Sequence, residues 1–377
     1  MKPSFLYRSP SCASIPSPGA RGLRGLPACL AAFALILVAI CASALYLTRG
    51  HFTYPLDDSY IHMTIARNVA TGDGFGINRG VFVSASSSPL WTFLLAAGFW
   101  AFGVRDLAPL ALNALLAFAV LTGSFRLLHR RCTCARRASL TLWCLMLLTP
   151  LPALTFLGME HVMHIGLVLW FCHLVAVTVS SGAGGCTTAL FASSGLLVMA
   201  RYEGLFLAGV ATLLLILRRR PLSALAVVLG CSIPVLGFGL YSLNHGGYLL
   251  PSSVALKGYR PEVSLAGAGS FALSGLARTA RSSHVCLLIL LALLNVTFLR
   301  SKGRNTDQYA ASIVWLLVGG TGLHMLFART GWFFRYEAYL VALGCIAVLS
   351  PVALPASAPV GCVRETEPTP VVAWRSC

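Results

Sequence analysis

Long apolar runs separated by short polar segments dominate the pattern of this chain. A hydrocarbon core about 30 Å thick needs about 20 apolar residues of helix, so this pattern predicts helices that cross a membrane. The fold class that we expect is all-α, a polytopic transmembrane bundle of about ten spans. The expected spans lie near residues 27–48, 107–129, 139–157, 162–180, 187–200, 204–217, 222–242, 284–300, 310–328 and 337–355.

Two of the apolar runs decide on which side of the membrane each loop lies. The run from 89 to 103 would be only about 23 Å long as a helix, so we expect an interfacial or re-entrant helix rather than a span. The run from 187 to 217 forms either one long helix or two short spans that meet at "RYEG", residues 201–204. Two spans place the basic loops at 218–220 and 300–304 inside, as the positive-inside rule requires.

These spans divide the chain into one membrane domain and two tails. Residues 27–355 form the expected transmembrane domain, with an outer loop at 49–106. Residues 1–26 are expected to be a cytoplasmic tail, and 356–377 a short C-terminal tail. The first run is longer than the roughly 7 to 15 apolar residues of a cleaved signal peptide, so we expect it to remain as the first helix.

Composition and charge support a membrane protein and argue against a nucleic-acid-binding one. Hydrophobic residues make up 57% of the chain and charged residues 10%, which leaves more apolar surface than a soluble core can bury. The net charge of +17 is spread over short loops, as expected of a chain oriented in a lipid bilayer. We expect a multi-pass protein of the inner or plasma membrane, with no nucleic-acid partner and no disulfide framework.

Most of the acidic residues share one side of this topology. Of the eleven Asp and Glu residues, the expected outer face carries Asp57, Asp58, Asp73, Asp106, Glu160, Glu203, Glu262 and Glu337. Carboxylates gathered at one set of helix ends predict a polar vestibule that faces the periplasm or exterior.

Two adjacent carboxylates, Asp57 and Asp58, open an amphipathic helix in which Ile61, Ile65 and Val69 repeat at helical spacing. One aspartate alone is explained by capping of the helix N-terminus. Adjacent carboxylates resist ionising together, so the pair suits a divalent metal or a general base with a raised pKa.

Other candidate residues lie in short motifs near the expected outer face. Glu160 in "GMEH" is an acid at membrane depth, which indicates function unless it simply reaches interfacial water. Arg201 and Glu203 in "RYEG" are most simply a local ion pair. Lys257 either neutralises a lipid phosphate or contacts headgroups without specificity. Arg335 lies among aromatic residues that are typical of interface anchors.

These motifs together resemble the bacterial GT-C glycosyltransferases. They are the aspartate pair, "SSSPLW", "LGMEH", "RYEGLFL", "LLPSSVALKG" and "FFRYEAYL". The resemblance extends over residues 30 to 350 and is greatest to arabinofuranosyl- and mannosyltransferase-like members that use polyprenyl-phosphate sugars. The chain differs in having Tyr202 where proline commonly follows the arginine, and we expect it to lack a folded C-terminal carbohydrate module.

The resemblance implies a role for each candidate. One of the two aspartates would be the general base, with a Mg²⁺ or Mn²⁺ ion held by acidic residues and the donor phosphate held by cations. Carried over by position, these residues are the catalytic pair Asp57 and Asp58, the metal candidates Asp58 and Glu160, and the phosphate-binding Arg201, Lys257 and Arg335.

The expected function is transfer of a sugar from a polyprenyl-phosphate donor to an acceptor hydroxyl of a glycan, lipid or protein at the outer face. A lipid phosphate is already a good leaving anion, so a base and phosphate-binding cations suffice, and a single displacement inverts the anomeric carbon. The alternatives are a transporter or flippase of a lipid-linked or anionic solute, which typically shows inverted repeats, and a non-catalytic scaffold. Transfer chemistry requires the candidate residues to converge on one outer cavity, whereas a scaffold would leave them scattered.

Overall fold

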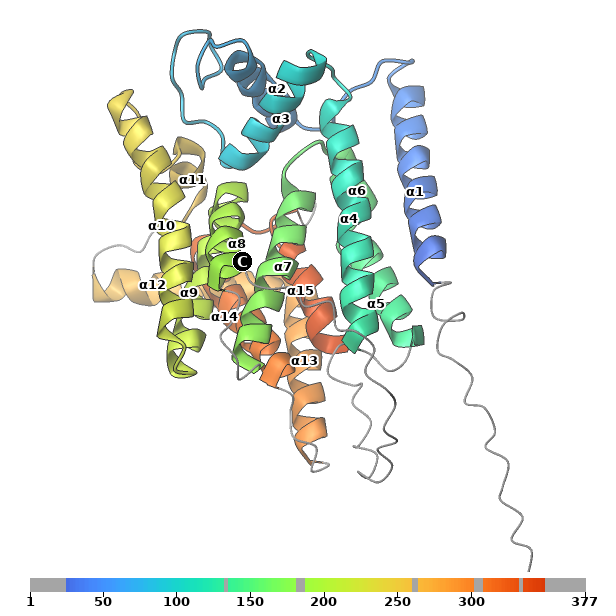
Figure 1. Ribbon diagram of the computed structural model, residues 1–377, viewed down its shortest axis with the longest axis vertical. Helices are drawn as coiled ribbons and strands as arrows, with labels where there is room; N and C mark the ends of the chain where they lie inside the picture. The colour runs from blue at the N-terminus through green and yellow to red at the C-terminus, as the bar shows by residue number, and fades with distance from the viewer. Residues whose placement is uncertain are drawn as a thin grey trace, which may run out of the picture.

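The regular structure is entirely helical in the part of the chain that the computed structural model describes, residues 25–131, 135–180, 187–259, 264–301, 308–331 and 335–349 (Figure 1). This confirms the expected all-α class. The helices are α1 (Gly25–Leu47), α2 (Asp57–Ala70), α3 (Pro89–Phe102), α4 (Ala108–Arg131), α5 (Ala135–Leu148), α6 (Leu151–Phe156), α7 (His161–Ser180), α8 (Thr187–Ala200), α9 (Gly204–Leu217), α10 (Pro221–Asn244), α11 (Ser252–Lys257), α12 (Leu265–Arg281), α13 (Ser283–Ser301), α14 (Gln308–Phe327) and α15 (Ala338–Leu349).

The helices that are long and apolar enough to cross a membrane number five among the described residues, or six if the bent pair α12 and α13 forms one span. The five are α1, α4, α7, α10 and α14. Shorter apolar helices are α3, α8, α9 and α15. The count of ten spans is therefore not confirmed. The expected span at 139–157 is interrupted at Pro150, between α5 and α6, because proline cannot donate the helical backbone hydrogen bond.

The apolar run from 187 to 217 forms two helices, as the charge pattern predicted. α8 ends at Ala200 and α9 begins at Gly204, with a turn at 201–203 between them. A side chain at Gly204 would bring its Cβ within 2.7 Å of Leu197 Cγ, so glycine permits the close approach of the two helix ends.

The helices α2 and α3 pack against each other at one end of the bundle (Figure 1). Ser88 caps α3, since its side-chain oxygen accepts a hydrogen bond from the Trp91 N–H at 3.3 Å, and Pro89 follows at the first helical position. α3 also contacts α4 and α8. The pair thus covers the bundle at the end where the short α8 terminates.

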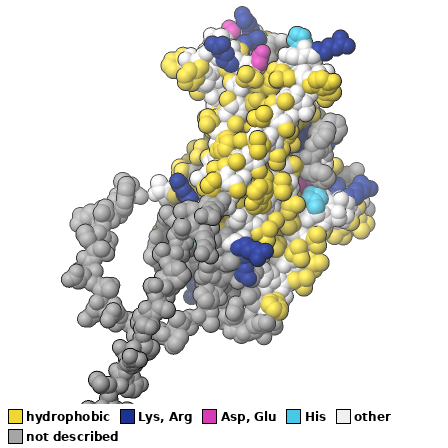
Figure 2. Space-filling model, turned by 90° about the vertical axis from the view of Figure 1, so that its right-hand side faces the viewer, with side chains coloured by type: hydrophobic (Ala, Val, Ile, Leu, Met, Phe, Trp, Pro, Cys, Tyr) yellow, Lys and Arg dark blue, Asp and Glu magenta, His cyan; other side chains and the backbone are white. Residues whose placement is uncertain are grey.

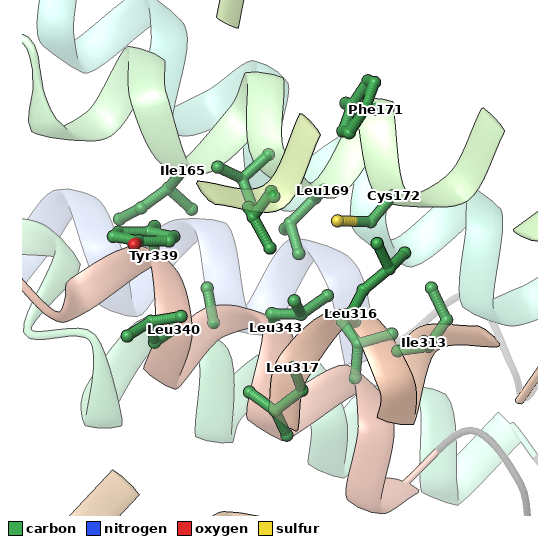
Figure 3. Packing of buried hydrophobic residues seen from close by; sticks show 14 of the residues in the cluster. Ile165, Leu169, Phe171, Cys172, Ile313, Leu316, Leu317, Tyr339, Leu340 and Leu343 are labelled. Atoms are coloured by element: carbon green, nitrogen blue, oxygen red, sulfur yellow. The ribbon is translucent and has the colours of Figure 1, made fainter. Parts of the chain in front are cut away.

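The core of the bundle is formed by α7, α14 and α15. Figure 3 shows Ile165 of α7 next to Tyr339 of α15. Leu169 of α7 lies near Leu343 of α15 and Leu316 of α14. Every residue of α15 from Ala338 to Ala347 is buried. A helix that is apolar on all sides is expected at the centre of a bundle.

The outer surface of the bundle is also strongly apolar. Large hydrophobic side chains of α1 are exposed, among them Leu35 and Val38 at 71% and 65%. Figure 2 shows a broad hydrophobic surface whose upper end carries charged side chains. Exposed apolar surface of this extent is typical of a surface covered by lipid.

The orientation of the bundle in the membrane is testable with cysteine labelling. The α2–α3 loop, which contains the exposed Asn78, and the turn after α9, which contains the exposed Arg218, lie at opposite ends of the bundle (Figure 1). In a cysteine-depleted chain in intact cells, Asn78→Cys should react with a membrane-impermeant thiol reagent. Arg218→Cys should react only after permeabilisation, because the positive-inside rule predicts that its basic loop faces the cytoplasm. The reverse pattern would place the α2 end in the cytoplasm.

Candidate functional site

Charged residues from distant parts of the chain meet at the end of the bundle beneath α2 and α3. Asp58 lies in the first turn of α2, and Glu160 directly precedes α7. Arg201 lies in the turn between α8 and α9, and Arg335 precedes α15. The sequence-predicted residues therefore converge, apart from Asp57 and Lys257.

A buried ion-pair group joins two of these segments, the start of α7 and the turn between α8 and α9. Arg201 Nη1 contacts Glu160 Oε1, and Arg201 Nη2 donates to Glu203 Oε1 at 2.6 Å. Glu160 is fully buried and Arg201 is 4% exposed. The local pair of Arg201 and Glu203 expected from "RYEG" is present. The longer-range contact with Glu160 extends it across the bundle.

The electrostatic balance of this group keeps Glu203 ionised. The adjacent Arg201 guanidinium offsets the cost of burying the Glu203 carboxylate.

The two adjacent aspartates have different environments. Asp58 Oδ2 accepts a hydrogen bond from Arg335 Nη2 at 2.9 Å, and its side chain is 24% exposed. Asp57 is exposed, and its Oδ1 accepts the Asp58 backbone N–H at 2.9 Å at the start of α2. Asp58 thus points towards the bundle, and Asp57 is placed to satisfy the helix N-terminus.

Further polar residues extend the site beyond those that the sequence indicated. His62 lies one turn after Asp58 on α2, with its Nε2 3.6 Å from Glu160 Oε2. Its Nδ1 lies 3.3 Å from Ser86 Oγ and 3.5 Å from Thr92 Oγ1. All three are buried. The spacing of four residues from Asp58 is the sequence signal that would have indicated His62.

The turn that presents Glu160 depends on a glycine. Gly158 has a φ of +67°, and a Cβ there would lie 2.5 Å from the Tyr54 ring. Asn113 Nδ2 donates to the Met159 carbonyl at 2.8 Å, and Ser59 Oγ donates to the Leu157 carbonyl at 2.5 Å. The turn is thus fixed by α2 and α4 before α7 begins.

Two sequence expectations receive no geometric support. Lys257 is the last residue of α11, and its side chain lies outside the described residues. Among the described residues, no group of three or more His, Cys, Asp and Glu side chains is arranged to hold a metal ion. Asp58 and Glu160, the metal candidates, instead contact different arginines. The divalent cation stays a prediction, and the chemistry below does not depend on it.

The chain has relatives of known structure and function. It is 27% identical over 219 residues to the terminal beta-(1->2)-arabinofuranosyltransferase of Mycobacterium tuberculosis, across 53% of this chain and 34% of that protein. It is similar in structure to ArnT from Cupriavidus metallidurans bound to undecaprenyl phosphate, with a TM-score of 0.56 and 16% identity over 85% of this chain and 60% of ArnT. For apo ArnT the TM-score is 0.50, over 85% and 59% of the two chains.

The chain therefore has the GT-C fold of ArnT, which confirms at the level of fold the resemblance inferred from the motifs. It spans about a third of the length of the mycobacterial relative and about 60% of ArnT. No family model matches it.

The buried ion-pair group should contribute much more to stability than an exposed pair. Arg201→Met leaves two carboxylates without their cation, so we expect the free energy of unfolding in detergent to fall by about 3–5 kcal/mol. Arg79→Met, which breaks an exposed pair with Asp73, should cost about 1 kcal/mol or less. Equal small losses in the two variants would contradict the importance assigned to the buried group.

Proposed function

We propose that this chain is a GT-C-type membrane glycosyltransferase that takes its sugar from a polyprenyl-phosphate donor. The observation that carries the proposal is the convergence of Asp58, Glu160, Arg201 and Arg335 at one end of a bundle with the fold of ArnT. Sugar transfer requires these residues to converge, whereas a non-catalytic scaffold does not. The relative named for arabinofuranosyl transfer favours a pentose as the sugar.

Asp58 is the general base in this proposal. Its ion pair with Arg335 fixes the carboxylate, and its partial exposure leaves it accessible to an acceptor hydroxyl. Asp58 takes the hydroxyl proton while the acceptor oxygen bonds to the anomeric carbon. The bond from that carbon to the phosphate oxygen breaks, and its electron pair leaves with the polyprenyl phosphate. One displacement of this kind inverts the anomeric centre.

The cations divide between two tasks. Arg201 is already engaged by two carboxylates, so its main task is to hold Glu160 and Glu203 in place. Arg335, with one carboxylate partner, and Lys257 are better suited to stabilise the phosphate of the donor. A direct contact between Arg201 and the phosphate stays a prediction. The acceptor hydroxyl would reach the site from the outer face, beneath α2 and α3.

The two aspartates should respond differently to removal of their charge. Asp58→Asn should lower turnover of a polyprenyl-phosphate sugar by about 10²- to 10⁴-fold, the usual contribution of positioned proton transfer. Asp57→Asn keeps an oxygen for the helix N-terminus, so its turnover should stay near that of the wild type. Turnover is measured by donor consumption at matched thermal stability. Wild-type rates in both variants would contradict the assignment of Asp58 as the general base.

Donor binding provides a second test that does not require turnover. Lys257→Met should weaken binding of polyprenyl phosphate by about 10- to 100-fold, the effect of losing one hydrogen bond to a charged group. Arg79→Met removes a cation from the exposed α2–α3 loop and is the matched control, with unchanged affinity expected. Binding is followed by the quenching of tryptophan fluorescence. Equal affinities in the two variants would mean that Lys257 makes only nonspecific contacts with lipid headgroups.

A further inference from the structure

Tyr336 lies between the two arginines of the site, although it belongs to neither ion pair. The centre of its ring is 4.9 Å from Arg335 Cζ and 5.5 Å from Arg201 Cζ. The His161 ring approaches it edge-on at a centroid distance of 6.4 Å. Tyr336 is 6% exposed. One buried aromatic ring is therefore shared by two cations that come from different segments.

The hydroxyl of Tyr336 adds a directional contact to this arrangement. Arg335 Nη2 donates to the Tyr336 hydroxyl at 3.0 Å, and the same nitrogen donates to Asp58 Oδ2 at 2.9 Å. A guanidinium Nη carries two hydrogens, so one is directed to each oxygen. The neighbouring Nη1 contacts Met159 Sδ at 3.2 Å. The hydroxyl thus fixes the plane in which Arg335 meets Asp58.

The aromatic ring of Tyr336 offsets a repulsion between the two arginines that apolar packing alone would not relieve. Two guanidinium groups brought into one buried site repel each other, and this repulsion favours other rotamers of the long arginine side chains. The negative face of an aromatic ring attracts a cation within about 6 Å, and most strongly where water is excluded. A leucine, although smaller, would occupy part of the space without attracting either arginine.

We propose that Tyr336 is a positioning residue for sugar transfer, one that holds Arg335 against Asp58 and couples this pair to Arg201 and Glu160. The inference rests on the function proposed above. Tyr336 contacts Arg335 through both its ring and its hydroxyl, and Arg335 contacts Asp58, so the proposal requires the effect of Tyr336 on the reaction to pass through Arg335. This dependence distinguishes it from a residue that only supports folding.

The first test separates the ring from the hydroxyl. Tyr336→Leu removes both contacts and should lower kcat by about 10- to 100-fold. Tyr336→Phe keeps the ring and should restore most of this loss, to within about threefold to tenfold of wild type. Tyr309→Phe is the matched control, because it removes a buried hydroxyl that bonds His173 at the opposite end of α14. Its kcat should not change.

The second test is a double-mutant cycle with Arg335→Gln. If Tyr336 acts through Arg335, Tyr336→Leu should lower kcat by less than about threefold in the Arg335→Gln background, since the group that it positions is gone. Thermal unfolding of each variant corrects turnover for the folded fraction. The same fold-loss of kcat in both backgrounds would mean that Tyr336 acts independently of Arg335, and would overturn the inference.

The remaining outcomes separate this inference from the proposed function. Unchanged turnover in both Tyr336 variants, together with the loss expected in Asp58→Asn, would overturn the positioning role and leave the glycosyltransferase intact. Wild-type turnover in Asp58→Asn would overturn the base assignment on which the inference rests. If Tyr336→Leu does not fold, Tyr336→Phe replaces it in the double-mutant cycle with Arg335→Gln. Independent effects of these two substitutions on kcat would then overturn the inference.

Discussion

A charge removed from water must be paired, and the pairing of Glu160 with Arg201 is the contact on which this site depends. An isolated carboxylate at this depth would be costly, so the segments that carry the two residues have to meet. The start of α7 supplies Glu160 through the turn at Gly158, and the break between α8 and α9 supplies Arg201. Because Arg201 also holds Glu203, three helix ends are fixed by one guanidinium.

Helix geometry explains why two neighbouring aspartates have separate partners. Successive residues of an α-helix point about 100° apart, so Asp57 and Asp58 cannot face the same partner. Asp58 meets Arg335, and His62, one turn later on the same face, meets Glu160. α2 is thereby joined to the bundle at two polar points one helical turn apart, while Asp57 remains in contact with solvent.

Apolar periodicity was sufficient to predict the helical class and the helix that begins at Asp57, because these follow from local chemistry. The break at 201–204 was predicted from the distribution of basic loops. The rarity of acidic residues in apolar surroundings was sufficient to indicate Glu160 and the aspartate pair as candidate site residues. The ion-pair partner of Asp58 was not predictable, since Asp58 and Arg335 are far apart in the sequence and only tertiary packing brings them together. His62 and Tyr336 were missed because a histidine or tyrosine between apolar runs has many roles, and only its neighbours show which one applies.

The short helices that complicate a count of spans have a physical consequence for the site. Fourteen residues of α8 or α9 extend only about 21 Å, less than the hydrocarbon thickness of about 30 Å. If the basic residues after α9 lie at the inner interface, the turn at 201–203 stops below the outer one. Irregular backbone at membrane depth is tolerated where protein buries it, and Arg201 and Tyr202 are both buried. A recessed turn of this kind places the charged site at the level where a lipid phosphate could reach it from the bilayer.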